Sequence, residues 1–131
     1  MAWKILTDYI RVWLNELGDE DYDLIMASFD ILAEKGPSLK RPLVGELHSD
    51  LFKNLKELRP GSKGKSEIRI IFIFDPKRQA VMLVAGDKNS KNKKERWEDW
   101  YNEKIPLAEK IYLNYLNKQE AQNDSRRIKT N

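Results

Sequence analysis

Residues 52–88, FKNLKELRPGSKGKSEIRIIFIFDPKRQAVMLVAGDK, have the pattern of three strands joined by two turns. The middle run, residues 68–74, consists of β-branched and aromatic residues and is interrupted only by Arg69. That composition is typical of a covered central strand. Asp75-Pro76 ends the run and apolar residues resume at Ala80, which predicts a hairpin with a short polar turn. The stretch therefore predicts three strands at the centre of the fold.

Alternation along these strands decides which side chains share a face. Glu57 and Arg59 lie on one face of the first strand, and Arg69 lies with Ile71 on the less apolar face of the middle strand. We expect the more apolar face to pack on helices and this one to stay more open. One carboxylate and three cations would then gather on the open face: Glu57, Arg59, Arg69 and, at the end of the third strand, Lys88.

The length of 131 residues predicts a single domain, and a charged fraction of 34% predicts a heavily charged surface. The chain has no cysteine, which excludes disulfides and thiolate metal sites. It shows neither an apolar run of about 20 residues nor a signal-peptide layout. It also lacks a glycine-rich phosphate loop and zinc-ligand spacing. We therefore expect a cytoplasmic protein with no membrane contact, no metal and no cofactor.

Charge is distributed unevenly along the chain. Residues 1–50 hold 5 Lys and Arg against 10 Asp and Glu, whereas residues 51–131 hold 19 against 11. A positive field over the predicted sheet favours a polyanion or an acidic partner. The alternative, a merely soluble charged surface, is equally compatible with the charge count.

Helical spacing of apolar residues predicts two helices before the sheet. The first runs from about Tyr9 to Leu17 and ends at Gly18, placed where a helix end favours a residue that tolerates positive φ. The second starts at Asp19 and ends at residues 36–37, Gly-Pro. Residues 3–6 are a candidate edge strand, and residues 37–50 are predicted to form a loop.

Residues 88–96, KNSKNKKER, are strongly basic and predicted to be exposed. They either grip a phosphate backbone or form a solvated loop. Of the aromatic residues 97, 100 and 101, at least one tryptophan is expected in the core. Pro106 suits the first position of a final helix, and residues 118–131 are polar enough to predict a disordered tail after a domain of residues 1–117.

The combination of these segments resembles HigB-like toxins of the phage-derived branch of the RelE/ParE superfamily. The matching motifs are residues 54–59 (NLKELR), Arg69 in its apolar strand, residues 74–78 (FDPKR), residues 85–88 (AGDK), Trp100-Tyr101 and residues 105–108 (IPLA). The resemblance implies an α+β fold in which two N-terminal helices pack on a twisted, mainly antiparallel sheet, followed by a C-terminal helix.

The resemblance also implies a function: a toxin that cleaves messenger RNA without a metal ion, generally on the ribosome, and that is held inactive by an antitoxin encoded by an adjacent gene. Arg59 and Arg69 match strand arginines that contact substrate phosphate in ribonuclease members, and Lys88 matches a further basic position. Leu55 and Glu57 stand where ribosome-dependent members carry lysines. Tyr101 and Tyr112 are the candidates for a catalytic tyrosine.

The residues support a specific chemical hypothesis. Ribonucleases of this kind use the ribose 2′-hydroxyl as nucleophile. Glu57 would act as the base, Arg59 and Arg69 would contact the phosphate, and Lys88 would bind phosphate or donate a proton. The expected RNA-binding residues are Lys53, Lys56, Lys91, Lys93, Lys94 and Arg96.

Three alternatives remain at this stage. Glu57 could simply form a structural ion pair with Arg59 or Arg69. The chain could be a non-enzymatic inhibitor of DNA gyrase, as other members of the superfamily are. It could also be a degenerate relative that binds RNA without turnover.

Overall fold

The computed structural model describes residues 2–61, 67–87 and 97–129, with the backbone alone for residues 97 and 123–129. A five-stranded sheet in the order β1-β5-β4-β3-β2 forms its centre. All neighbouring strands are antiparallel except β1, which runs parallel to β5. The strands are β1 (Lys4–Leu6), β2 (Val44–Glu46), β3 (Leu55–Leu58), β4 (Ile68–Asp75) and β5 (Gln79–Asp87). The predicted α+β fold with a mainly antiparallel sheet is confirmed.

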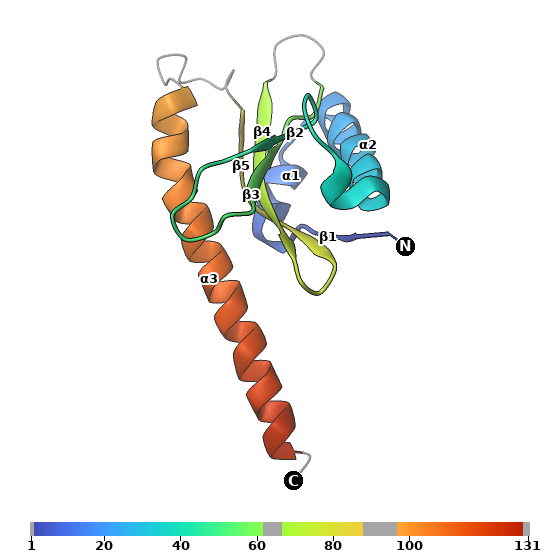
Figure 1. Cartoon of the computed structure of the whole chain (residues 1–131). Helices are drawn as coiled ribbons and strands as arrows, with labels where there is room; N and C mark the ends of the chain where they lie inside the picture. The colour runs from blue at the N-terminus through green and yellow to red at the C-terminus, as the bar shows by residue number, and fades with distance from the viewer. Residues whose placement is uncertain (1, 62–66, 88–96, 130–131) are drawn as a thin grey trace.

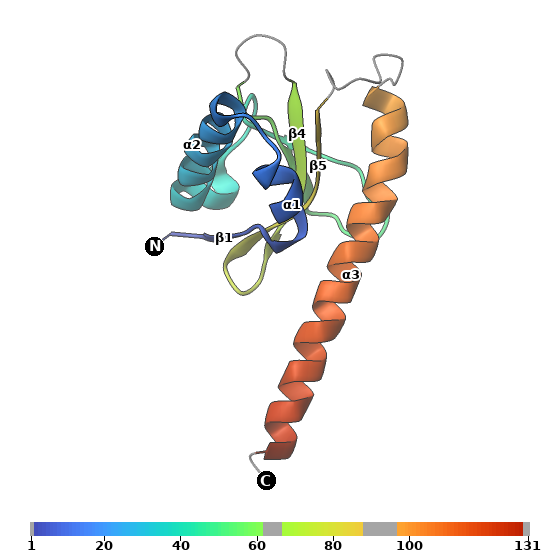
Figure 2. The same ribbon diagram turned by 180° about the vertical axis from the view of Figure 1, so that it is seen from behind.

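The N-terminal helices cover one face of the sheet, as the alternation of β4 predicts. A 3₁₀ turn, η1 (Asp8–Ile10), leads into α1 (Arg11–Asn15), and α2 (Asp19–Lys35) follows. Figure 1 and the reverse view in Figure 2 show both helices on the side of the sheet opposite α3. Their apolar residues form one core cluster with those of the strands: Ile10, Leu14, Ile25, Phe29, Leu32, Val44, Leu58, Ile68, Ile70, Phe72, Ala80 and Met82.

The opposite face is covered by α3 (Trp97–Lys129), so the expectation that it stays open is wrong. Trp100, Ala108, Tyr112 and Tyr115 fall on one stripe of this helix and pack on β3, β4 and β5. Ile71 pairs with Val84 but Phe72 pairs with Met82. This bulge turns both Leu83 and Val84 toward α3. The bulge thus adds an apolar side chain to the face that α3 covers.

The start of α3 also corrects the sequence prediction. The helix begins at Trp97, and Pro106 lies within it rather than at its first position. A proline inside a helix costs about 3 kcal/mol. Trp100 before it and Ala108 after it are both buried against the sheet, and this packing holds the helix together across the proline. Helical backbone continues through Lys129, into the segment for which we expected disorder, and extends past the end of the sheet (Figure 1).

Two further expectations are wrong in detail. The predicted loop at residues 37–50 contains the 3₁₀ turn η2 (Gly36–Ser38) and strand β2, because Val44 is buried opposite Leu58. Gly18 has a φ of −69° and precedes α2, so it does not use positive φ. Gly36 does, at φ 57°, and the Trp3 indole occupies the space that a side chain there would need.

Candidate active site

Glu57, Arg59 and Tyr101 meet on the α3-covered face at the end of β3. The Glu57 side chain is 2% exposed. Its Oε1 accepts a hydrogen bond from Nε of Arg59 at 2.6 Å and lies 2.5 Å from Nη2 of the same guanidinium. Its Oε2 accepts a hydrogen bond from the Tyr101 hydroxyl. Both carboxylate oxygens are thus engaged, one by a strand residue and one by a helix residue.

This arrangement follows from the local sequence. Alternation turns residue 57 toward α3, and Arg59 stays beside it because its N–H bonds the Leu43 carbonyl at 2.7 Å. Gly45 lies opposite Glu57 in the β2–β3 register. A Cβ at Gly45 would come 3.3 Å from Glu57 Oε1 and 3.8 Å from Arg59 Nε, so glycine leaves room for the ion pair.

The electrostatics of the site keep Tyr101 and Arg59 in fixed protonation states. Burial raises the pKa of the Tyr101 phenol to about 12; the hydrogen bond and negative charge of Glu57 add to the rise, and the charges of Arg69 and Arg59 oppose it. For Arg59, burial lowers the pKa, but the hydrogen bonds and charges of Glu57 and Tyr101 together outweigh burial and leave the pKa raised. At neutral pH Tyr101 is therefore a hydrogen-bond donor and Arg59 a cation.

Arg69 lies close enough for its charge to act on Tyr101. Its Nη1 donates to the Ile68 carbonyl at 2.9 Å, and its Nη2 lies 3.5 Å from Glu67. The Arg69 side chain is 13% exposed, against 33% for Arg59. The structure therefore brings Glu57, Arg59 and Arg69 to one region, as the alternation predicts, and adds Tyr101, for which the sequence offered only a weak signal.

Of the remaining predicted residues the structure describes only Lys53 and Lys56, and neither joins this cluster. Lys88, Lys91, Lys93, Lys94 and Arg96 lie outside the described residues. Lys53 is exposed in the segment before β3. Lys56 points to the opposite face of the sheet, where it pairs with Glu46 at 3.6 Å.

A second buried carboxylate, Asp75, accepts hydrogen bonds from the middle of α3. Its Oδ1 accepts a hydrogen bond from the Tyr112 hydroxyl at 2.8 Å, and its Oδ2 accepts one from Tyr115 at 3.2 Å. Burial, followed by the hydrogen bond to Asp75, raises the pKa of Tyr112. Burial and then the charge of Asp75 raise the pKa of Tyr115 to about 12. Tyr112, the other candidate for a catalytic tyrosine, is thus bound to Asp75 rather than to the Glu57 cluster.

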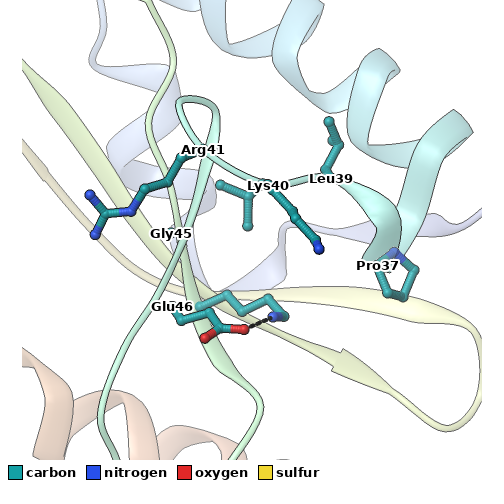
Figure 3. A pocket seen from close by; sticks show the side chains of 8 residues that line it. Pro37, Leu39, Lys40, Arg41, Gly45 and Glu46 are labelled. Carbon is teal, nitrogen blue, oxygen red and sulfur yellow. Dashed lines mark ion pairs between the residues drawn. The ribbon is translucent and has the colours of Figure 1, made fainter.

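A pocket of about 670 Å³ lies at the β2 edge of the sheet (Figure 3). Its polar lining consists of Lys40, Arg41, Glu46 and Lys56. Sequence reasoning missed this pocket, because residues 37–50 were expected to form a loop. Within the described ranges, no three His, Cys, Asp or Glu side chains are grouped to hold a metal ion. No helix in those ranges has the length and apolar character needed to cross a bilayer.

Comparison with known proteins tests the resemblance. The profile of a family described as phage derived protein Gp49-like matches residues 12–113. A Mycobacterium tuberculosis (strain ATCC 25618 / H37Rv) protein named "Putative toxin HigB2" is 45% identical over 127 residues, 97% of this chain but only 61% of the relative. "Putative toxin HigB3" of the same strain is 37% identical over 112 residues, 86% of this chain and 91% of the relative. The chain belongs to the phage-derived Gp49-like family and is HigB-like, as its motifs predicted.

Proposed function

We propose that this protein is the toxin of a toxin–antitoxin pair and a metal-independent endoribonuclease that cleaves messenger RNA, on the ribosome. The observation that carries the proposal is a buried carboxylate, Glu57, held by Arg59 and Tyr101, with Arg69 close enough for its charge to act on Tyr101. The toxin names of the two relatives support the biological role. Such a toxin works in the cytoplasm and is held inactive by a cognate antitoxin.

The proposed reaction requires a base, a group that stabilises charge on the phosphate, and a proton donor for the departing oxygen. The 2′-oxygen of the ribose attacks the adjacent phosphorus and loses its proton, the P–O5′ bond breaks, and the 5′-oxygen gains a proton. The products are a 2′,3′-cyclic phosphate and a 5′-hydroxyl. Arg59 and Arg69 contact the phosphate and stabilise the charge that develops on it. Lys88 binds phosphate or supplies the proton to the 5′-oxygen.

Glu57 can act as the proposed base only if one of its present contacts is released. In the described conformation Nε and Nη2 of Arg59 both lie on its Oε1, and Tyr101 donates to its Oε2, so Oε1 has no lone pair left for the 2′-hydroxyl. A substrate phosphate that takes the guanidinium fork of Arg59 would release Oε1 for the 2′-hydroxyl. Phosphate binding would thus uncover the base, and the alternative, a purely structural ion pair, predicts no such coupling.

The experiment is 5′-end mapping of transcripts after brief induction of the protein in a bacterial host. The variants are Arg59→Lys, which keeps the charge beside Glu57 but loses the fork, and Glu57→Gln, which keeps the shape but cannot accept a proton as a base. Lys4→Gln, on the far edge of the sheet, is the control. Circular dichroism establishes that each variant is folded.

The proposal expects new ends within translated regions for the parent and the control, and few or none for Arg59→Lys and Glu57→Gln. Equal cleavage by the folded Glu57→Gln variant would remove the base role. Intact transcripts with growth arrest and supercoiling defects would favour gyrase inhibition instead. Growth without arrest would favour a relative that has lost activity.

A further inference from the structure

The pocket at the β2 edge, lined by Pro37, Leu39, Lys40, Arg41, Val44, Gly45, Glu46 and Lys56, lies outside the Glu57 cluster. Alternation separates the two, because Lys56 and Glu57 are neighbours on β3 that point to opposite faces of the sheet. Gly45 takes part in both: it lines the pocket and also leaves room for the Glu57–Arg59 pair. β2 is an edge strand of three residues, so only one short strand separates the pocket from the candidate active site.

The charge of Lys56 is poorly compensated. The Lys56 side chain is only 16% exposed, but its partner Glu46 is 89% exposed and lies 3.6 Å away (Figure 3, dashed line). An exposed carboxylate at that distance adds little stability and is free to rotate into solvent. A mostly covered ammonium, by contrast, gains from a stronger anion. Lys56 is therefore a cation whose partner, Glu46, can be replaced by another anion.

Two more cations stand around the same space. Lys40 and Arg41 are exposed, and no carboxylate in the described part of the chain pairs with either. Figure 3 shows Lys40 extending toward the Lys56–Glu46 pair and Arg41 extending away from it. Lys40 and Lys56 both line this pocket, so displacement of Glu46 would leave two lysine ammonium groups available to one anion.

We propose that this pocket binds a backbone phosphate of the RNA strand, next to the phosphate held at Arg59. The inference rests on the proposed ribonuclease function and adds a substrate subsite to it. A volume of about 670 Å³ falls within the range of small-ligand pockets and is large enough for a nucleotide. The strand would pass over the short β2 edge, with one phosphate on Arg59 and a neighbouring one on Lys56 in place of Glu46. The pocket thus positions RNA and performs no chemistry.

The test is the affinity of purified full-length variants for a fluorescent single-stranded RNA with 2′-deoxy nucleotides, which binds but is not cleaved. Fluorescence anisotropy is measured over a range of salt concentrations. The variants are Lys56→Gln, Lys40→Gln and Glu46→Gln. Lys4→Gln, on the opposite edge strand β1, changes net charge by the same amount as either lysine variant and is the control.

Lys56→Gln should raise Kd several-fold. It should also make the plot of log affinity against log salt concentration less steep by about 0.7, the value for one lost phosphate contact on a single strand. Lys40→Gln should act in the same direction. Glu46→Gln should lower Kd, because it removes the competing carboxylate, and Lys4→Gln should change neither quantity beyond the effect of net charge. In cleavage assays the lysine variants should raise KM and leave kcat unchanged.

If the parent cleaves RNA but Lys56→Gln and Glu46→Gln bind it as Lys4→Gln does, the subsite is wrong and the ribonuclease proposal stands. If the parent neither binds nor cleaves RNA, both proposals are wrong. A polyglutamate peptide serves as the second probe. If Glu46→Gln binds that peptide more tightly than the parent does but binds RNA no more tightly, the phosphate subsite is wrong. The pocket would then be assigned to an acidic protein partner.

Discussion

The Glu57 side chain must meet two opposed requirements, one from the stability of the fold and one from the proposed reaction. Its carboxylate is almost fully buried and is held by Arg59 and Tyr101. A buried charge is stable only while it is paired. The proposed reaction, however, needs that carboxylate to be released when phosphate arrives. Variants at this position must therefore be judged on both the free energy of unfolding and the rate of cleavage.

Removal of Arg59 should destabilise the fold more than neutralisation of its partner does. Arg59→Ala leaves the buried charge of Glu57 unpaired, which costs about 3–5 kcal/mol in a fully buried pair and less here because Arg59 is one-third exposed. Glu57→Gln removes the charge and should cost less. The double variant Glu57→Gln with Arg59→Ala should be more stable than Arg59→Ala alone. Urea unfolding of the four proteins measures the coupling, and strictly additive effects would contradict it.

Gly45→Ala should lower cleavage without unfolding the protein. The added Cβ would stand 3.3 Å from Glu57 Oε1 and 3.4 Å from its Cγ, so the carboxylate must shift by a few tenths of an ångström relative to Arg59. Gly61→Ala is the matched control, because no atom of the described residues lies within 4 Å of a Cβ there. Transcript cleavage and thermal unfolding are measured for both, and equal cleavage by the two folded variants would show that the pair tolerates displacement.

At the scale of elements, the docking of α3 on β5 depends on one close approach. Trp100 lies directly over Gly86, where a Cβ would come 2.6 Å from the indole Nε1 and 2.9 Å from Cε2. A rigid indole cannot yield as a flexible side chain does, so Gly86→Ala should destabilise the fold by about 1–3 kcal/mol. Chemical unfolding measures this, with Gly61→Ala again as control. Stability equal to the control would mean that the N-terminal end of α3 is loosely held.

The elements also show what the sequence could predict. Local alternation was sufficient to place Glu57, Arg59 and Arg69 on one face, because strand geometry has a fixed period of two. It was not sufficient to show that α3 covers that face. The bulge at Leu83 and the helix running through Pro106 both depend on tertiary packing, which overrides local propensity. The pocket was missed for a similar reason, since β2 forms by pairing with β3, where Val44 lies opposite Leu58.

Across the whole molecule, three tyrosines tie α3 to the sheet through two buried carboxylates. Tyr101 bonds Glu57 near one end of the packed stripe, and Tyr112 and Tyr115 bond Asp75 near the other. Each phenol must stay protonated to donate its hydrogen bond. The attachment of the helix that covers the candidate active site is therefore sensitive to the protonation of its tyrosines.

Alkaline solution should consequently loosen α3. The folded pKa is about 12 for Tyr101 and Tyr115, against 10.0 for the ordinary side chain. A raised pKa means that the stabilisation is fully present below pH 10 and is lost as pH rises from 10 toward 12. Tyrosinate absorbance and near-ultraviolet circular dichroism should therefore change together in that window. Tyr112→Phe with Tyr115→Phe should weaken the dependence of stability on pH there, and Tyr22→Phe, at an exposed position, should leave it unchanged. Ionisation of all tyrosines near pH 10 with intact packing would show that α3 is held by its apolar stripe alone.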